Sequence, residues 1–203
     1  MGVRAKAAEA LGAGLEGGGL SEEDVGRAVG ALAGVLGAEG REQDPDVDVR
    51  RKTVEALGAG VGAMSEEELG RAVGVLLGTF AREKRESHPS DWVLQNCRVA
   101  LGLVKGKGGG RVEAGRLFPF WCQGLGAVEG VERWADADLR SDCAHAVGRV
   151  LFAGEAPEVW VDVGWRGLCG TLGVVDGLEA DTAGEVREES LAALGEVMRR
   201  GVV

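Results

Sequence analysis

Four cysteines and two histidines are the side chains of this 203-residue chain best suited to catalysis or metal binding. The cysteines, Cys97, Cys122, Cys143 and Cys169, follow one another at intervals of 21 to 26 residues, so the chain has no CxxC pair. Each lies in a segment with helical apolar periodicity. This pattern indicates buried, reduced thiols of a cytoplasmic or nuclear protein, and neither disulfides nor zinc ligands.

The two histidines form no recognisable catalytic or metal-binding motif. His88 precedes Pro89 in an expected loop, and His145 lies two residues after Cys143 on an expected helix. Side chains two residues apart on a helix point in different directions, so Cys143 and His145 cannot act together. We therefore predict no catalytic residues, no metal ligands and no cofactor, and we expect that the protein is not an enzyme.

Two glycine-rich segments match nucleotide-binding motifs only in part. Gly12, Gly14 and Gly17 fit the GxGxxG pattern. That motif requires a preceding strand, whereas these glycines overlap the end of an expected helix. The segment "GKGGG" (106–110) lacks both the spacing and the Ser or Thr of a phosphate-binding loop. It is more typical of a basic turn between helices.

The charge balance restricts the classes of partner. The chain has 33 acidic and 23 basic residues and a formal net charge of −10. Nucleic-acid-binding proteins carry basic surfaces, so we expect no nucleic-acid partner. No apolar stretch approaches 18 residues, so we expect no membrane span. An acidic surface favours a protein partner with a basic segment, and the oligomeric state stays open.

A 12-residue sequence near the start of the chain is repeated. "VRAKAAEALGAG" (3–14) returns as "VRRKTVEALGAG" (49–60). With the valine as position 0, the unit begins at Val3, Val49, Val93, Leu139 and Val186, at spacings of 46, 44, 46 and 47. Every copy has alanine at position 7, namely Ala10, Ala56, Ala100, Ala146 and Ala193. Every copy has glycine at position 9, namely Gly12, Gly58, Gly102, Gly148 and Gly195.

The repeated residues predict how these helices pack. Positions 0, 4, 7, 8 and 11 share one face of a helix, and position 4 always carries a small side chain. Glycine inside a helix costs about 0.5–1 kcal/mol relative to alanine. Its recurrence in all five copies therefore predicts close approach of a neighbouring helix, although the general glycine richness of the chain, with 36 glycines, is an alternative source of part of the pattern.

A second set of helices is expected between these five segments. "SEEDVGRAVGALAGVLG" (21–37) and "SEEELGRAVGVLLGTFA" (65–81) are copies of each other, and 111–128 and 157–173 are weaker copies. Ser21 and Ser65, each followed three residues later by an acid, predict capped N-termini. Pro119 predicts a kink or a late start in the third copy, and Pro157 a first helical position in the fourth.

These patterns predict an all-α protein, a right-handed α-solenoid of stacked antiparallel helical hairpins with a period of about 46 residues. We expect one array over 1–203, with repeats at approximately 1–45, 46–89, 90–135 and 136–180 and a terminal helix at 181–203. One hairpin cannot bury both of its faces, whereas stacked hairpins form a continuous core and leave a long surface for a partner.

The chain resembles the HEAT-repeat (armadillo-like) family over nearly its whole length. The resemblance is carried by Asp48-Val49-Arg50, Asp138-Leu139-Arg140 and Glu185-Val186-Arg187, while Trp92-Val93-Leu94 departs from the pattern. It implies a non-catalytic protein-binding scaffold. "QNCRVALGLV" (95–104) and "LRSDCAHAVGRVL" (139–151) resemble importin-β-type nuclear transport receptors, so a fragment of such a receptor is one alternative. A HEAT-like enzyme is the other.

The aromatic residues supply the candidate binding site. All nine lie between Phe80 and Trp165. They either enlarge the cores of the third and fourth repeats or lie exposed as anchors for a partner. For the second case we choose Trp121, Trp160 and Trp165, with Glu113, Glu158 and Asp162 nearby to attract a basic segment.

Overall fold

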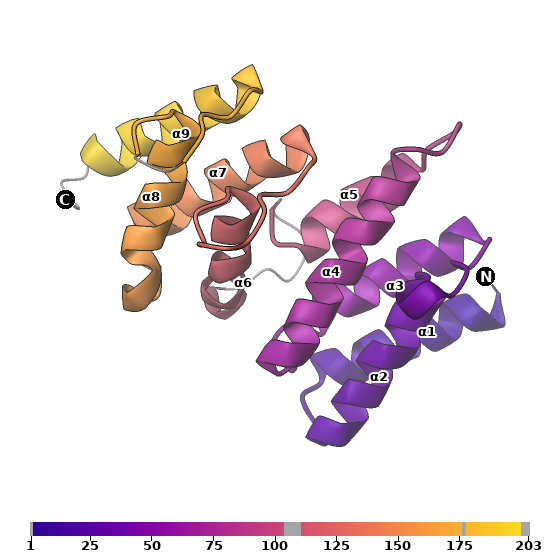
Figure 1. Ribbon diagram of the computed structural model, residues 1–203. Coiled ribbons are helices and arrows are strands. Elements are labelled where there is room, and N and C mark those ends of the chain that lie inside the picture. The colour runs from indigo at the N-terminus through magenta and orange to yellow at the C-terminus, as the bar shows by residue number, and fades with distance from the viewer. Residues whose placement is uncertain (1, 104–110, 176–177, 200–203) are drawn as a thin grey trace. The chain divides into compact units, whose positions relative to one another are not determined.

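The computed structural model describes residues 2–103, 111–175 and 178–199, and within these ranges the chain is helical and contains no strand (Figure 1). The prediction of an all-α protein is confirmed. The elements are α1 (Val3–Glu16), α2 (Glu22–Val35), η1 (Ala38–Gly40), α3 (Val47–Ala59), α4 (Glu66–Glu83), α5 (Asp91–Ala100), α6 (Arg111–Gly124), α7 (Ala137–Ala153), η2 (Glu158–Trp160), α8 (Val161–Thr171) and α9 (Gly184–Arg199).

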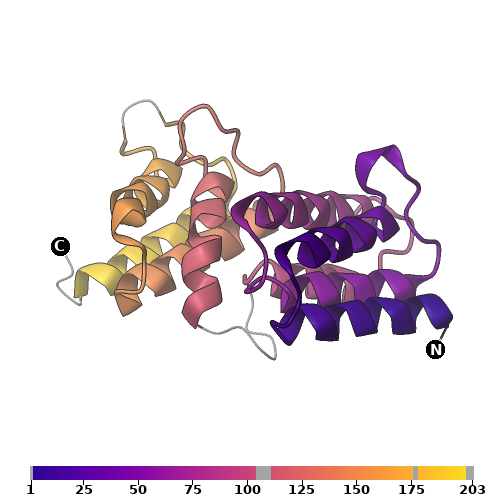
Figure 2. The same cartoon turned by 90° about the horizontal axis from the view of Figure 1, so that it is seen from below.

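The helices form two compact units, one containing α1–α5 and the other α6–α9. In the first unit α3 packs between α1 and α5, and α2 packs against α4, which gives the two layers visible in Figure 2. In the second unit α7 packs against α9, while α6 and α8 both contact α7. The single array expected over 1–203 stays a prediction, because each unit is described by itself.

The serine caps predicted for α2 and α4 are confirmed. Ser65 Oγ accepts a hydrogen bond from the Glu68 N–H at 3.3 Å, and Glu68 Oε2 accepts one from the Ser65 N–H at 2.7 Å. Ser21 Oγ likewise accepts from the Asp24 N–H at 3.2 Å. These bonds satisfy backbone donors that the first helical turn leaves without partners.

Four of the five helices that carry the repeated unit, α3, α5, α7 and α9, bury the residues of the predicted face, whereas α1 leaves Val3, Ala7 and Ala10 exposed. In α3, Val49, Thr53 and Ala56 are at most 4% exposed. Thr53 satisfies its hydroxyl by donating to the Val49 carbonyl at 2.8 Å, which makes a small polar residue acceptable in this apolar position. The corresponding residues of the later copies are also buried: Val93, Cys97 and Ala100, Leu139, Cys143 and Ala146, and Val186, Ser190 and Ala193.

The repeated glycine marks the closest approach between successive helices. A Cβ on Gly12 would lie 2.8 Å from the Ala56 Cβ, and one on Gly58 would lie 2.9 Å from the Ala100 Cβ. Gly148 stands in the same relation to Ala193. In each case the glycine at position 9 meets the alanine at position 7 of a later copy, and we call this contact a Gly–Ala rung. The packing role predicted for the glycine is confirmed at these three positions.

The other two copies differ from this prediction. Gly102 lies beyond α5 with a φ of +69°. This glycine therefore terminates the helix and does not form a Gly–Ala rung. A Cβ there would lie 2.8 Å from Leu117 Cδ1 and 3.0 Å from the ring of Trp121. Gly195 is inside α9, but no described heavy atom lies within 4 Å of the position its Cβ would take.

Buried arginines add a second repeated contact. Arg50 Nε donates to Glu83 Oε1 at 2.7 Å, and Arg140 Nε donates to Asp181 Oδ2 at 2.6 Å. The Nη1 atom of each arginine also donates to two carbonyls of the segment before its own helix. Each guanidinium thus links the start of one helix to the chain that leads into the next repeat.

The late start predicted from Pro119 and the helical position predicted for Pro157 need correction, while the kink at Pro119 stays a prediction. Helix α6 begins at Arg111 and runs through Pro119, so the late start is wrong. Pro157 has an extended backbone (φ −58°, ψ 133°) and precedes the short 3-10 helix η2, so it is not a first helical residue. In the described part of the chain, no helix has the length and apolar character needed to cross a membrane.

Candidate functional site

Trp121 belongs to the core, so its choice as an exposed anchor is wrong. It is 3% exposed, and its ring packs edge-on against Phe118 with the ring centroids 6.3 Å apart. Leu117, one turn before Trp121, is also buried. The three side chains lie on α6 in the unit where α6 packs against α7, so Trp121 enlarges the core.

The two other tryptophans lie at the start of α8 and are half-buried. Trp160 ends η2 and donates its backbone N–H to the Pro157 carbonyl at 2.8 Å. Trp165 lies in the second turn of α8. Val159, next to Trp160, is 81% exposed. The segment therefore presents apolar and aromatic surface without placing all of it in the core.

Carboxylates accompany these side chains. Glu158 and Asp162 are exposed and occupy the first turns of η2 and α8. Acidic residues at a helix N-terminus are also stabilised by the helix dipole. Arg166, exposed one turn after Asp162, is the basic residue of this group. We define the α8 surface as Glu158, Val159, Trp160, Asp162 and Trp165.

Glu113, the remaining residue of the predicted site, lies outside the residues whose side chains are described. The structure therefore brings together Trp160, Trp165, Glu158 and Asp162 in one short segment, and removes Trp121 from the candidate site.

Trp92 is an exposed tryptophan that the sequence pattern did not single out as a site residue. It is 74% exposed in the first turn of α5. It precedes position 0 of its copy, where three other copies carry Asp48, Asp138 and Glu185. A position that carries an acid in three copies faces solvent, and this signal could have identified Trp92 as exposed.

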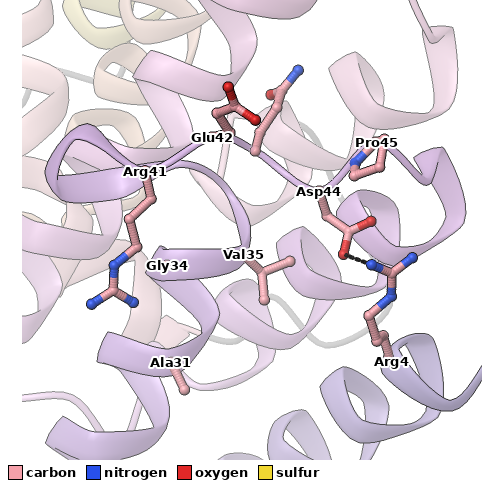
Figure 3. A pocket seen from close by; sticks show the side chains of 9 residues that line it. Arg4, Ala31, Gly34, Val35, Arg41, Glu42, Asp44 and Pro45 are labelled. Atoms are coloured by element: carbon pink, nitrogen blue, oxygen red, sulfur yellow. Dashed lines mark ion pairs between the residues drawn. The ribbon is translucent and has the colours of Figure 1, made fainter.

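A shallow polar pocket lies in the first unit, between α1, α2 and the segment that leads to α3 (Figure 3). Its volume is about 430 Å³. The charges lining it partly neutralise one another: Arg4 pairs with Asp44 at 3.0 Å, and Asp44 also accepts a hydrogen bond from the Asp46 N–H at 3.0 Å. Arg41 and Glu42 also line the pocket, so the formal charges of its two arginines and two carboxylates sum to zero. The pocket thus has no excess charge to select a ligand.

The thiols lie in apolar surroundings. Burial raises the pKa of Cys97 and of Cys122 to about 12, and it raises the pKa of Cys143 and of the half-buried Cys169 as well. A raised pKa lowers the thiolate fraction at neutral pH and therefore the nucleophilicity of these groups.

The histidines take part in single contacts. His145 Nδ1 lies 2.7 Å from Glu189 Oε1, which links α7 to α9 at the surface. His88 Nδ1 lies 2.5 Å from the carbonyl of its neighbour Ser87. Within the ranges that the structure describes, no three or more His, Cys, Asp or Glu side chains are grouped so that they could hold a metal ion.

Comparison with protein-family models, with curated proteins and with solved structures finds no match to this chain.

Proposed function

We propose that the protein is a non-catalytic scaffold of the cytoplasm or nucleus that binds a partner protein through the α8 surface and adjoining helices of a HEAT-like solenoid. The partner carries a basic segment with at least one apolar side chain. Support comes from the buried shared faces of α3, α5, α7 and α9, because stacked hairpins of a solenoid would leave an outer layer of helices for a partner.

The α8 surface is the observation that carries this proposal. Trp160 and Trp165 are each half-buried, and a tryptophan side chain loses little conformational entropy when a partner covers it. Val159 adds apolar area that would gain about 25 cal/mol per Å² on burial. Glu158 and Asp162 would attract lysine or arginine side chains at the rim and accelerate association at low ionic strength.

A pull-down from native extract, after cross-linking, tests the proposal. The original chain, the double variant Trp160→Ala/Trp165→Ala and the double variant Glu158→Lys/Asp162→Lys are compared. We expect both variants to lose the same proteins, and we expect recovery by the original chain to fall as salt is raised.

Trp92→Ala is the matched control, since it removes an exposed tryptophan from the other unit. It should leave recovery unchanged. An identical set of recovered proteins with the Trp160→Ala/Trp165→Ala variant would rule out the α8 surface as the binding site.

A nuclear transport receptor fragment is a narrower form of the same proposal, favoured by the net charge of −10. In that case the proteins lost with the variants would carry lysine- and arginine-rich nuclear targeting segments, and a synthetic peptide of that type would compete with them.

A further inference from the structure

The Gly–Ala rungs use two different faces of each repeat helix. The Gly face consists of positions 5, 9 and 12 of a copy, and the Ala face of positions 0, 4 and 7. Where a rung is present, the residues at positions 5 and 12 of the Gly face are buried: Ala8 and Leu15, Val54 and Val61, and Ala144 and Leu151.

Helix α9 has an uncovered Gly face. Leu191 at position 5 is 63% exposed and Met198 at position 12 is 65% exposed. Gly195 at position 9 has no described heavy atom within 4 Å of the position its Cβ would take. Among the described residues, no helix packs on the Gly face of α9 in the way that α9 packs on the Gly face of α7.

Helix α1 has the converse property, an uncovered Ala face. Val3 at position 0 is 85% exposed, and Ala7 and Ala10 at positions 4 and 7 are exposed as well. The same three positions are at most 5% exposed in each later copy, where a preceding helix covers them.

We propose that two copies of this chain associate head to tail, with the Ala face of α1 of one copy seated on the Gly face of α9 of the other. The fit is one that the molecule already makes three times, at Gly12 with Ala56, Gly58 with Ala100, and Gly148 with Ala193. In the contact between copies, Ala10 takes the place of Ala193 and Gly195 takes the place of Gly148. Each copy has one face of each kind, so the contact between copies is heterologous.

Charges at the edge of the contact favour the same occupant. In the internal rungs, position 6 of one helix lies beside position 3 of the next, as in Glu9–Lys52 at 3.6 Å and His145–Glu189 at 2.7 Å. The corresponding residue of α1 is Lys6. On α9, the exposed carboxylates Glu188 and Glu196 lie one turn before and one turn after position 6, so the lysine meets opposite charge.

Sedimentation equilibrium over about 1 μM to 1 mM tests the proposal, since this range spans the affinities of small, transient interfaces. The weight-average mass should rise with concentration above that of one chain. Gly195→Trp fills the Gly face and Ala10→Trp fills the Ala face, and each should hold the protein at the mass of one chain. Neither position is enclosed by described neighbours, so the folds should be retained, and far-UV spectra check this.

A mixture of the two variants separates head-to-tail docking from other modes. Each variant keeps one intact face, so the mixture should form one-to-one pairs and nothing larger. Gly74→Trp, on an open position of α4, is the control and should associate like the original chain. An original chain that stays at the mass of one copy up to about 1 mM, single variants that still associate, or a mixture without pairs would each overturn the proposal.

Discussion

Arg140 and Asp181 form a buried bidentate ion pair, with Nε–Oδ2 at 2.6 Å and Nη2–Oδ1 at 2.9 Å. The two residues are 6% and 1% exposed. Asp181 also accepts a hydrogen bond from the Ala183 N–H at 2.9 Å, which places the carboxylate in the segment before α9. The pair therefore fixes the entry of α9 relative to the start of α7.

Removal of the carboxylate should be strongly destabilising. Asp181→Ala leaves the Arg140 guanidinium buried without its counter-charge, and breaking such a pair costs about 3–5 kcal/mol. Asp162→Ala, at an exposed carboxylate of α8, should change the free energy of unfolding by less than about 0.5 kcal/mol. Urea denaturation of both variants measures the difference. If both variants changed the free energy of unfolding by the same small amount, the Arg140–Asp181 pair would make no net contribution to stability.

The same pair should make stability depend on pH in the acid range. Burial by itself would raise the pKa of Asp181, but hydrogen bonds from Arg140 and the Ala183 N–H, with the charges of Arg140 and Arg133, outweigh it and leave the pKa below its usual value. A carboxyl whose pKa is lower in the folded state than its unfolded value of about 3.9 stabilises the fold when the pH is above that unfolded value. This stabilisation is lost as the pH falls through the folded-state pKa. The free energy of unfolding should therefore drop below about pH 4. In Asp181→Asn this part of the pH dependence should be absent; an unchanged profile would refute the assignment.

The sequence predicted the all-helical fold and the serine caps because both depend on local patterns. It predicted the role of Gly58 because the cost of a glycine inside a helix can be offset by a contact that only glycine permits. Gly195 recurs at the same position without such a contact among the described residues. It could not predict the partner of Arg50 or Arg140. The acids lie at different distances before their helices, Glu83 ten residues before Val93 and Asp181 five residues before Val186, so no fixed register marks them.

The candidate site was predicted less well. Trp121 and Trp165 both lie in segments with apolar periodicity, and composition does not distinguish a core tryptophan from one at the surface. The burial of Trp121 depends on α7 and on Gly102, a residue of the second unit that lies against the Trp121 ring. Such contacts join segments that are separate in the sequence. The exposure of Trp92, in contrast, follows from its register position in the repeat.

The capping box of α4 should contribute measurably to stability. Ser65→Ala removes the acceptor for the Glu68 N–H and should destabilise the protein by about 1 kcal/mol. Ser87→Ala, in the exposed segment after α4, is the matched control and should be neutral within about 0.5 kcal/mol. Thermal unfolding followed by circular dichroism compares them. A Ser65→Ala variant as stable as the original chain would mean that water replaces the Ser65 hydroxyl as acceptor with no loss of folding free energy.

Thiol labelling should distinguish the cysteines by burial. Cys97, Cys122 and Cys143 are buried with raised pKa values, whereas Cys169 is half-buried. A maleimide at neutral pH should therefore modify Cys169 first, and the other three only at the rate of unfolding. Mass spectrometry of digested, timed samples identifies the sites. Rapid modification of Cys143 in the native protein would contradict its place in the core.

The stacking of repeat helices through Gly–Ala rungs is tested most directly by the free energy of unfolding of Gly58→Ala compared with Gly74→Ala. Both glycines are inside helices, so alanine gains about 0.5–1 kcal/mol of helix propensity at each. A Cβ on Gly58 would lie 2.9 Å from both Cα and Cβ of Ala100, whereas one on Gly74 has open space. We predict that Gly58→Ala destabilises the protein by about 1–3 kcal/mol while Gly74→Ala stabilises it. Stabilisation by both variants to the same extent would contradict the close packing of α3 against α5.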